Sequence, residues 1–477
     1  MPNPILPFNE YIPDVEAHVF NDRIYLFGSH DKEGGNRFCM LDYVLYSASI
    51  YDLTKWTYHG VIYKKEEDPR SNGDKLVDYY APDLVKGNDN KFYLYYVAMG
   101  PNTRNFGPIS VAVSDKIKGP YKYYHDVSLN KEPLLKYLNN DPTILNDNGK
   151  IYLYYGWGLG RDFSNKLFKP LFNIVESKLF NRSIKEIKET KPSILSCAFL
   201  KLKDNMFEVD YGPVPILDSK TTANKKSNLY KHAFYEAPSI RKFNNLYYLV
   251  YSSNENNELC YATSLYPNKD FIYRGVIISN TDLNYKGNKK AKAFGGTIHG
   301  SIECINGKYY IFYHRLTRNS NFSRQVCAER IEIKENGEIK QVEMTSIGLD
   351  DKPLSTIGTY SSFNACNIFH KARKTRKNEA MYTKDDDNNY IIKNIKNGFI
   401  IGYKYFDFKS DVTLVIRLKG SKGKIKVSDG NNIFYKKLIK SKIYKDYEIF
   451  INFKGIKPLY IEYIGLGSID LLEIKFK

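Results

Sequence analysis

The chain has 477 residues, of which 42% are hydrophobic, and it contains 42 Tyr and 27 Phe. This composition supplies enough apolar surface for two or three packed domains, so a disordered protein is excluded. The net charge is +18, but residues 351–477 hold 25 basic and 13 acidic residues, so the larger part of the chain carries little excess charge. No nucleic-acid-binding motif accompanies the lysines, and we expect no nucleic-acid partner.

The apolar runs are short. A typical one spans Ile151 to Tyr155, whereas a bilayer-spanning helix needs roughly 18 to 20 apolar residues. The first residues lack the basic and apolar regions of a secretion signal, so we expect a cytoplasmic protein with no membrane partner. The six cysteines share no C-x-x-C spacing, which predicts reduced thiols rather than a zinc site or disulfides. The sequence does not predict the oligomeric state.

One sequence pattern recurs five times along the chain. An ionisable residue beside Pro or Gly is followed by a short apolar strand, a polar turn and an aromatic strand. The copies run from Asp14 to Tyr25, Asp83 to Tyr93, Asp141 to Tyr152, Glu236 to Tyr247 and His299 to Tyr310. Successive leading residues lie 58 to 95 residues apart, which leaves room for a four-stranded sheet in each copy. The repeat predicts an all-β fold with a five-bladed β-propeller over residues 1–345. One helix is expected in an insertion at roughly Lys166 to Ile187.

The leading residues of the five copies are all ionisable. In a propeller, the residue that starts the innermost strand of each blade lies at one mouth of the central channel. A single Asp beside Pro is more often a turn residue, but five aligned ionisable leaders favour a shared site. Carboxylates that cluster in a partly desolvated pocket raise one another's pKa. One protonated and one ionised carboxyl group are the requirement for hydrolysis of a glycosidic bond.

Four of the leading motifs resemble glycoside hydrolase family 43 over about residues 1–345. They are Tyr11-Ile-Pro-Asp14, Asn140-Asp141-Pro142, Tyr235-Glu236-Ala-Pro-Ser and His299-Gly-Ser-Ile, each followed by an aromatic strand. The resemblance implies that Asp14 is the general base, that Glu236 is the general acid, and that Asp141 orients the acid and tunes its pKa. It also implies an inverting, exo-acting glycosidase that removes terminal β-xylose or α-L-arabinofuranose from oligosaccharides and needs no cofactor for its chemistry. The two catalytic carboxyl groups of an inverting enzyme stand about 6.5 to 9.5 Å apart.

Four further residues are candidates for substrate or metal contacts. The resemblance implies that His299 binds a calcium ion (Ca²⁺) or its water in the central channel, although imidazole is not a preferred ligand of calcium. The alternative is a neutral His299 that is hydrogen-bonded to water and a carboxylate. Arg324 is expected to contact sugar hydroxyls or to pair with Asp141 or Asp14. Trp157 is expected to be a platform for a sugar ring or a core residue. Asp83 is expected at the wall of the substrate pocket or directly behind it.

Residues 346–477 no longer show the repeat. Alternating apolar and polar residues predict a jelly-roll-like β-sandwich there, with strands at 411–418, 423–427, 447–453, 459–463 and 471–476. The segment resembles a family 6 carbohydrate-binding module. It contains no Trp, so a structural role against the propeller stands beside sugar binding as an interpretation.

Two other functions fit the same repeat. A retaining propeller glycosidase or a glycoside phosphorylase would use differently placed acids, and a retaining pair stands only about 5 to 5.5 Å apart. A non-catalytic sugar-binding propeller would keep the blades without turnover. The presence of all three acids argues against this last alternative. The loops that would select the sugar are the least readable parts of the sequence.

Overall fold

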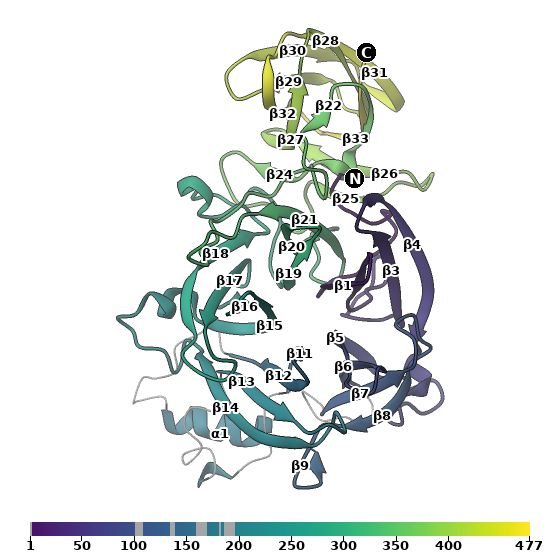
Figure 1. Ribbon diagram of the computed structural model, residues 1–477. Helices are drawn as coiled ribbons and strands as arrows, with labels where there is room; N and C mark the ends of the chain where they lie inside the picture. The colour runs from purple at the N-terminus through teal and green to yellow at the C-terminus, as the bar shows by residue number, and fades with distance from the viewer. Residues whose placement is uncertain (1, 101–107, 134–138, 159–168, 181–182, 186–195) are drawn as a thin grey trace.

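The computed structural model consists of five blades around a hub and a separate C-terminal body (Figure 1). It describes residues 2–100, 108–133, 139–158, 169–180, 183–185 and 196–477. The expected all-β fold, a five-bladed β-propeller followed by a β-sandwich, is confirmed by this arrangement.

Each blade is one antiparallel sheet whose strands follow one another in the chain. The first blade holds β1 (Glu16–Phe20), β2 (Arg23–Phe27), β3 (Tyr43–Ser49) and β4 (Asp52–Tyr63), and the second holds β5 (Asp78–Lys86), β6 (Phe92–Met99), β7 (Ile109–Ser114) and β8 (Lys122–Asp126). The third holds β11 (Thr143–Asp147), β12 (Lys150–Gly156), β13 (Ser196–Leu202) and β14 (Val209–Asp218). The fourth holds β15 (Phe234–Phe243), β16 (Leu246–Ser253), β17 (Glu258–Ser264) and β18 (Ile272–Ser279), and the fifth holds β19 (Gly300–Ile305), β20 (Lys308–Leu316) and β21 (Arg324–Ile331). The innermost strands β1, β5, β11, β15 and β19 contact one another around the hub.

The N-terminal segment closes the ring. The fifth blade has three strands, and the free edge of β21 is covered by the first residues of the chain. The Ile5 N–H donates to the carbonyl oxygen of Val326 at 3.2 Å. The amide side chain of Asn3 exchanges two hydrogen bonds with the backbone of Ala328, at 2.9 and 3.0 Å. A covered edge offers no free backbone groups for pairing with another chain.

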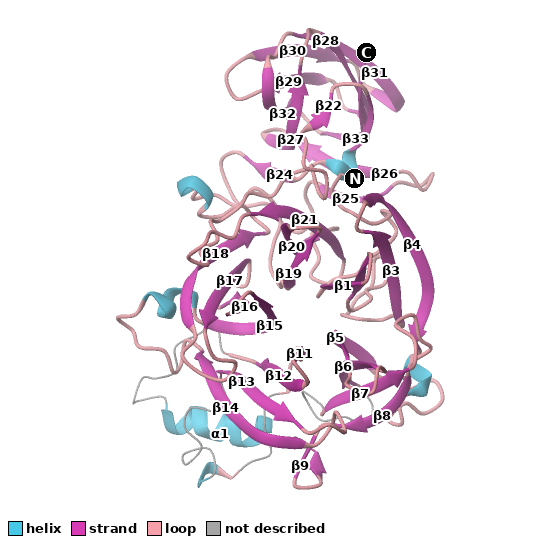
Figure 2. Ribbon diagram, in the orientation of Figure 1, coloured by secondary structure: helices cyan, strands magenta, loops and turns pink. Residues whose placement is uncertain are grey.

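Short elements lie between the blades. Helix α1 (Lys169–Phe180) lies in the connection between β12 and β13, on the outside of the third blade (Figure 2), which confirms the helix expected in this insertion. The ends of the expected range, at Lys166 and Ile187, lie outside the described residues. The remaining elements are β9 (Ser128–Leu129), β10 (Glu132–Pro133) and the 3₁₀ turns η1 (Lys65–Glu67), η2 (Asn228–His232), η3 (Tyr285–Gly287) and η4 (Ser362–Asn364).

The C-terminal body consists of two six-stranded sheets. One contains β22 (Leu354–Ser355), β24 (Asn367–His370), β27 (Phe399–Phe408), β29 (Gly423–Ser428), β30 (Ile433–Leu438) and β32 (Gly455–Ile464). The other contains β23 (Gly358–Ser361), β25 (Met381–Lys384), β26 (Tyr390–Lys396), β28 (Val412–Gly420), β31 (Ser441–Ile451) and β33 (Ser468–Phe476). Buried residues of both sheets form one hydrophobic core, among them Ile401 and Phe406 from β27 and Leu414 and Ile474 from the opposite sheet. Two sheets that share one core form a sandwich.

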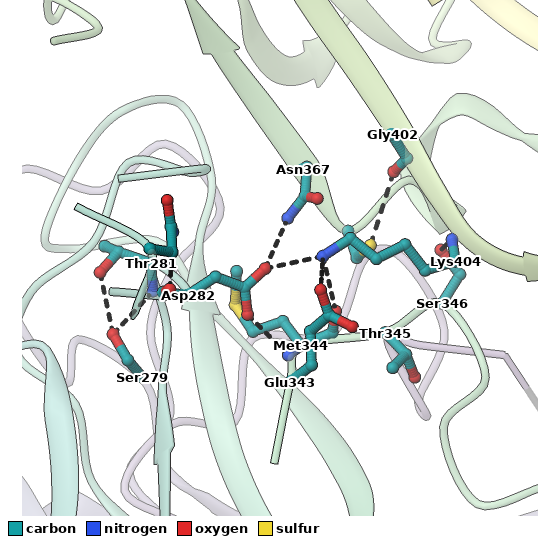
Figure 3. A network of polar contacts seen from close by, with 12 residues as sticks. Ser279, Thr281, Asp282, Glu343, Met344, Thr345, Ser346, Asn367, Gly402 and Lys404 are labelled. Atoms are coloured by element: carbon teal, nitrogen blue, oxygen red, sulfur yellow. Dashed lines mark hydrogen bonds and ion pairs between the residues drawn. The ribbon is translucent and has the colours of Figure 1, made fainter. Parts of the chain in front are cut away.

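A buried ion network joins the two bodies. The Lys404 ammonium group, on β27, lies 2.8 Å from both Asp282 Oδ2 and Glu343 Oε1, which belong to the propeller side (Figure 3). Asn367 of β24 donates to the same Asp282 oxygen at 3.1 Å. Lys404 and Asp282 are 2% and 3% exposed. A charge buried to this extent needs its partners, because burial of an unpaired charge is costly.

In the described part of the chain, no helix is both long enough and apolar enough to cross a membrane. All six cysteines are free thiols.

Candidate active site

The leading acids of the repeat lie where the backbone turns into the innermost strands. Asp14 and Asp141 have φ angles of 53° and 49°, and Ala237, which follows Glu236, has a φ of 61°. Such left-handed conformations are uncommon for residues other than glycine and gather at functional sites. Each turn also contains a proline, which has no N–H for the strand ladder. Asp14 and Asp141 therefore stand just before their strands, and Glu236 lies in β15 at a position where the pairing with β16 is irregular.

The structure brings Asp14, Asp141 and Glu236 into one cluster, although 222 residues of sequence separate the first from the last. The negative charge of Asp14 raises the pKa of both other carboxyl groups, and Glu236 raises the pKa of Asp141. The N–H of Ala237 donates to Asp141 Oδ2 at 2.9 Å, which ties the third blade to the residue beside Glu236. Electrostatic coupling of this strength requires that the three groups share one region of low dielectric.

Asp14 is the ionised member of the cluster. Burial would raise its pKa, but the Arg324 guanidinium, together with smaller effects of His299, His314 and a hydrogen bond from Ser29, outweighs burial, and the pKa lies below its usual value. Arg324 Nη1 lies 2.7 Å from Asp14 Oδ1. His299 and His314 also face this oxygen, at 3.8 and 3.9 Å from their Nδ1 atoms. Burial lowers their pKa values to about 4 and about 3, so both imidazoles are neutral at pH 7 and Arg324 is the cation that Asp14 faces.

Arg324 is held in place by Asp31, which the sequence did not single out. Its Nε and Nη2 atoms donate to the two Asp31 oxygens at 2.8 and 3.0 Å, and its guanidinium lies 4.8 Å from the centre of the Phe38 ring. Arg324 is 4% exposed and Asp31 is 1% exposed. A bidentate pair of this kind fixes the direction of the third nitrogen. Of the two roles expected for Arg324, pairing with Asp14 is the one observed.

Glu236 is half-buried and carries a raised pKa. Burial raises the pKa to about 7, the charge of Asp14 adds to the effect, and Arg324 and a hydrogen bond from Trp157 oppose it. The pKa of Asp141 is raised well above its usual value, first by burial and then by the charges of Glu236 and Asp14. Two neighbouring carboxyl groups with raised pKa values share a proton near neutral pH. The cluster therefore combines one ionised carboxylate with a carboxyl pair that shares a proton.

Trp157 lies at the edge of the cluster. Its ring centroid is 6.0 Å from that of Tyr235, and its side chain is half-buried rather than part of the core. The next residue, Gly158, donates its N–H to the carbonyl oxygen of Tyr235 at 2.5 Å. A Cβ atom at position 158 would lie 2.4 Å from the Phe234 carbonyl oxygen, so only glycine allows this approach of the third blade to the fourth. This contact places the indole beside Glu236.

The residues around His299 do not fit a calcium ion, contrary to the expectation for this position. His299 is 5% exposed, and the carboxylate that it faces, Asp14, is already paired with Arg324. Calcium binds six to eight oxygen atoms, and a neighbouring guanidinium repels it. The alternative, a neutral histidine, agrees with the lowered pKa, but the 3.8 Å between His299 Nδ1 and Asp14 Oδ1 is too long for the expected hydrogen bond to the carboxylate. His299 therefore belongs to the surroundings of Asp14.

Asp83 lies in a buried charged network in the hub. It is fully buried, and its Oδ1 atom is 2.6 Å from His18 Nε2. In the same network, Arg241 Nη2 lies 2.7 Å from Glu16 Oε2, and its Nε atom lies 3.6 Å from Glu303 Oε2. Glu16, His18 and Asp83 offer ligand atoms within 4.8 Å of one another. The Arg241 guanidinium already supplies a cation to this network. The residues therefore fit a buried ion-pair network better than a metal site.

A second cluster with metal-ligand chemistry lies in the fourth blade. His232, Glu258 and Cys260 offer ligand atoms within 4.8 Å of one another. His232 Nδ1 lies 2.5 Å from Glu258 Oε1, and the Ser253 hydroxyl donates to the same oxygen at 2.7 Å. These hydrogen bonds satisfy the carboxylate without an ion.

Comparison with known proteins identifies the family of this chain. The family model for glycosyl hydrolases family 43 matches residues 1–339. A xylosidase/arabinosidase of Thermoclostridium stercorarium is 38% identical over 98% of this chain and 97% of its own length. Xylosidase/arabinosidase 43A of Humicola insolens is 28% identical over 69% of this chain and 96% of its own length.

A solved structure shows the same fold. It is a β-xylosidase/α-arabinofuranosidase from a compost microbial metagenome, in complex with xylotriose and in a calcium-free form. It is 26% identical to this chain, covers 72% of this chain and 97% of its own, and has a TM-score of 0.53. The family match spans the five blades, and the relative from Thermoclostridium stercorarium matches nearly the whole chain. The chain is therefore a glycosidase and belongs to glycosyl hydrolases family 43.

Proposed function

We propose that the protein is an inverting, exo-acting glycosidase that removes terminal β-xylose or α-L-arabinofuranose units from oligosaccharides. The observation that carries the proposal is the pair of opposite carboxyl states: Asp14 with a lowered pKa and Glu236 with a pKa of about 7 in one cluster. The names of the relatives, which include xylosidase/arabinosidase over the full chain, support a pentose as the substrate.

The proposed roles follow from these states. The Asp14 carboxylate removes a proton from a water molecule, and the water oxygen attacks the anomeric carbon. The bond between this carbon and the glycosidic oxygen breaks, and the Glu236 carboxyl group gives its proton to the departing oxygen. Asp141 and Glu236 share a proton near neutral pH, because burial and their mutual repulsion disfavour ionisation of both carboxyl groups. Both proton transfers end with Asp14 protonated and Glu236 ionised, and solvent restores the starting state.

In this mechanism Arg324 and Trp157 support the reaction without exchanging protons with the substrate. Arg324 keeps Asp14 ionised through the 2.7 Å contact. Trp157 presents a half-buried indole beside Glu236, where a flat aromatic face suits a sugar ring.

A panel of aryl glycosides tests both the substrate and the acid. Wild type, Glu236→Ala and Asp14→Ala are assayed on 4-nitrophenyl β-xyloside, α-L-arabinofuranoside and β-galactoside and on xylobiose. We expect Glu236→Ala to lose activity on xylobiose and to recover part of it on the nitrophenyl pentosides, because a good leaving group needs no protonation. Asp14→Ala should stay inactive on both. Wild-type rates for Glu236→Ala on xylobiose would refute the assignment of the acid.

The configuration of the first product tests the mechanism. Proton NMR of a fresh reaction on a β-xyloside should show α-xylose before the anomers equilibrate. An initial β-anomer would instead identify a retaining enzyme.

A further inference from the structure

A cavity that is separate from the acid cluster lies between the propeller and the sandwich. It has a volume of about 340 Å³, the size of a small-ligand site. Its walls include Tyr285 from the loop after β18 and Phe369, Tyr405 and Tyr460 from the sandwich. Tyr285, Tyr405 and Tyr460 are half-buried, so their rings are partly exposed to solvent. An opening lined by several aromatic side chains suits a ring-shaped ligand with polar edges.

The acidic side chains of this cavity are already neutralised. Asp282 and Glu343 both bind the ammonium group of Lys404, as Figure 3 shows. The hydroxyl group of Tyr405 donates to the second oxygen of Glu343 at 2.5 Å. The two carboxylates are therefore held by Lys404, Tyr405 and Asn367, and they form the floor of the cavity rather than a site for a cation.

Two further lysines of the cavity have no such partner. The Lys292 ammonium group lies 4.3 Å from the centre of the Phe369 ring, and that of Lys286 lies 5.2 Å from the centre of the Tyr285 ring. Within the described residues, neither ammonium lies within 4.0 Å of a carboxylate oxygen. Burial and the charges of Lys404 and Lys290 lower the pKa of Lys292, and the charges of Asp282 and Glu343 oppose this only in part. A bound anion would offset this repulsion.

Two basic segments adjoin residues that line the cavity, one around Lys286 and Lys292 and the other just after Phe369, and they are together called the basic rim. The segment 286–292 contains four lysines, and the segment 371–377 contains five basic residues and no acid. The two segments touch, because Lys290 Nζ donates to the Lys371 carbonyl oxygen at 3.4 Å. Of these nine basic residues, Lys371 and Arg373 form the ion pairs found in the described part of the chain. The charge excess of residues 351–477 is therefore concentrated in part at this rim.

We propose that the cavity between the two domains binds an acidic oligosaccharide, with the carboxylate of one uronic acid residue on Lys292 and its sugar ring against the tyrosines. The basic rim holds the acid groups of neighbouring sugar residues. The aromatic walls favour a sugar over a simple inorganic anion. The small size of the cavity, about 340 Å³, and the position of the free ammonium inside it favour a sugar carboxylate over a nucleic acid, which a basic groove with stacking platforms along its length would suit.

Calorimetric titration of the full-length protein tests the proposal. The probe is trigalacturonic acid, and its matched control is the trimethyl ester, which has the same sugars without the charges. Because neither contains a pentose, this test is independent of the proposed reaction. We expect the acid to bind at least about tenfold more tightly than the ester, the effect of a lost charged hydrogen bond. Equal binding of acid and ester would overturn the proposal.

Two variants locate the binding. Lys292→Met should weaken binding of the acid at least about tenfold. Lys289→Met removes the same charge from an exposed position of the same loop and should change binding less than about twofold. Both should keep wild-type activity on an aryl pentoside. If Lys292→Met does not fold, the comparison of acid with ester still decides.

Other outcomes contradict the proposal. Unchanged binding of the acid by folded Lys292→Met would place the ligand elsewhere. Inorganic sulfate or oligouridylate that binds more tightly than the trisaccharide, and loses affinity in Lys292→Met, would show a site for simple anions or for nucleic acid instead.

Discussion

Replacement of Arg324 by Met should shift the whole pH profile of activity upwards. In the proposed mechanism the acidic limb of kcat/KM follows ionisation of Asp14, and the basic limb follows loss of the Glu236 proton, near the pKa of about 7. Arg324 lowers the pKa of both groups. Removal of the Arg324 charge therefore moves both limbs of the kcat/KM profile to higher pH.

The contact geometry gives the size of the shift. Arg324 Nη1 lies 2.7 Å from Asp14 Oδ1. Two unit charges separated by roughly 4 Å interact by about 4 kcal/mol at an effective dielectric constant of about 20, which corresponds to about three pKa units. Asp residues beside Arg commonly show shifts of about one to three units. We expect the acidic limb of Arg324→Met to move up by about one to three units, and the basic limb to move by less because Glu236 has no direct ion pair with Arg324.

The assay is kcat/KM on a nitrophenyl pentoside across the pH range, with circular dichroism to confirm folding. Asp31→Asn is the matched control, because it removes a partner of Arg324 and leaves the guanidinium beside Asp14. This control should keep the acidic limb in place or lower it slightly. A folded Arg324→Met with an unchanged acidic limb would refute the idea that Arg324 holds Asp14 ionised.

Four other outcomes are expected. Asp141→Asn removes the carboxyl group that shares a proton with Glu236, so Glu236 should lose its proton at a lower pH, which a shift of the basic limb to lower pH would reveal. Arg241→Met leaves buried carboxylates unpaired and should lower the free energy of unfolding in urea by about 3 to 5 kcal/mol, whereas a metal chelator should leave wild-type activity unchanged. Burial raises the pKa of Glu329 to about 8 from its usual 4.5, so its protonated form stabilises the fold below pH 4.5, and this stability is lost as the pH rises to about 8. Urea titrations across this range should show the loss in wild type and a smaller loss in Glu329→Gln. A chain that ends at residue 345 should yield no folded protein by circular dichroism.

The sequence predicted the acid cluster because the position of each acid is repeated. Asp14, Asp141 and Glu236 hold equivalent places in three blades, and the ring geometry turns equivalent places into neighbours. Asp31 could not be found this way, because it lies in the loop between β2 and β3, beyond the stretch from Asp14 to Tyr25 that the repeated pattern covers. Its role depends on a partner, Arg324, that lies 293 residues away.

The sequence also contained an indication of the charged network in the hub, which the repeated pattern alone did not explain. Glu16, Arg241 and Glu303 are charged residues within innermost strands, where the other strand residues are mostly apolar. Opposite charges at inward positions of several aligned copies indicate an ion-paired centre. In this network the positive charge comes from Arg241 of the fourth blade, which pairs with Glu16 of the first.

The sandwich is a structural part of this enzyme as well as an appended domain. The relative from Humicola insolens is covered almost completely by about two thirds of this chain, so a family propeller can stand without such a domain. Here the propeller has buried polar groups whose partners lie in the sandwich. Asp282, 3% exposed, is neutralised by Lys404. Arg315, 6% exposed, donates to the Ala365 carbonyl oxygen at 3.0 Å and lies 4.3 Å from the centre of the Tyr382 ring. Without the sandwich, Asp282 and Arg315 would lose these partners, and apolar surface beside them would be exposed to water. The stability of this propeller therefore depends on its second domain.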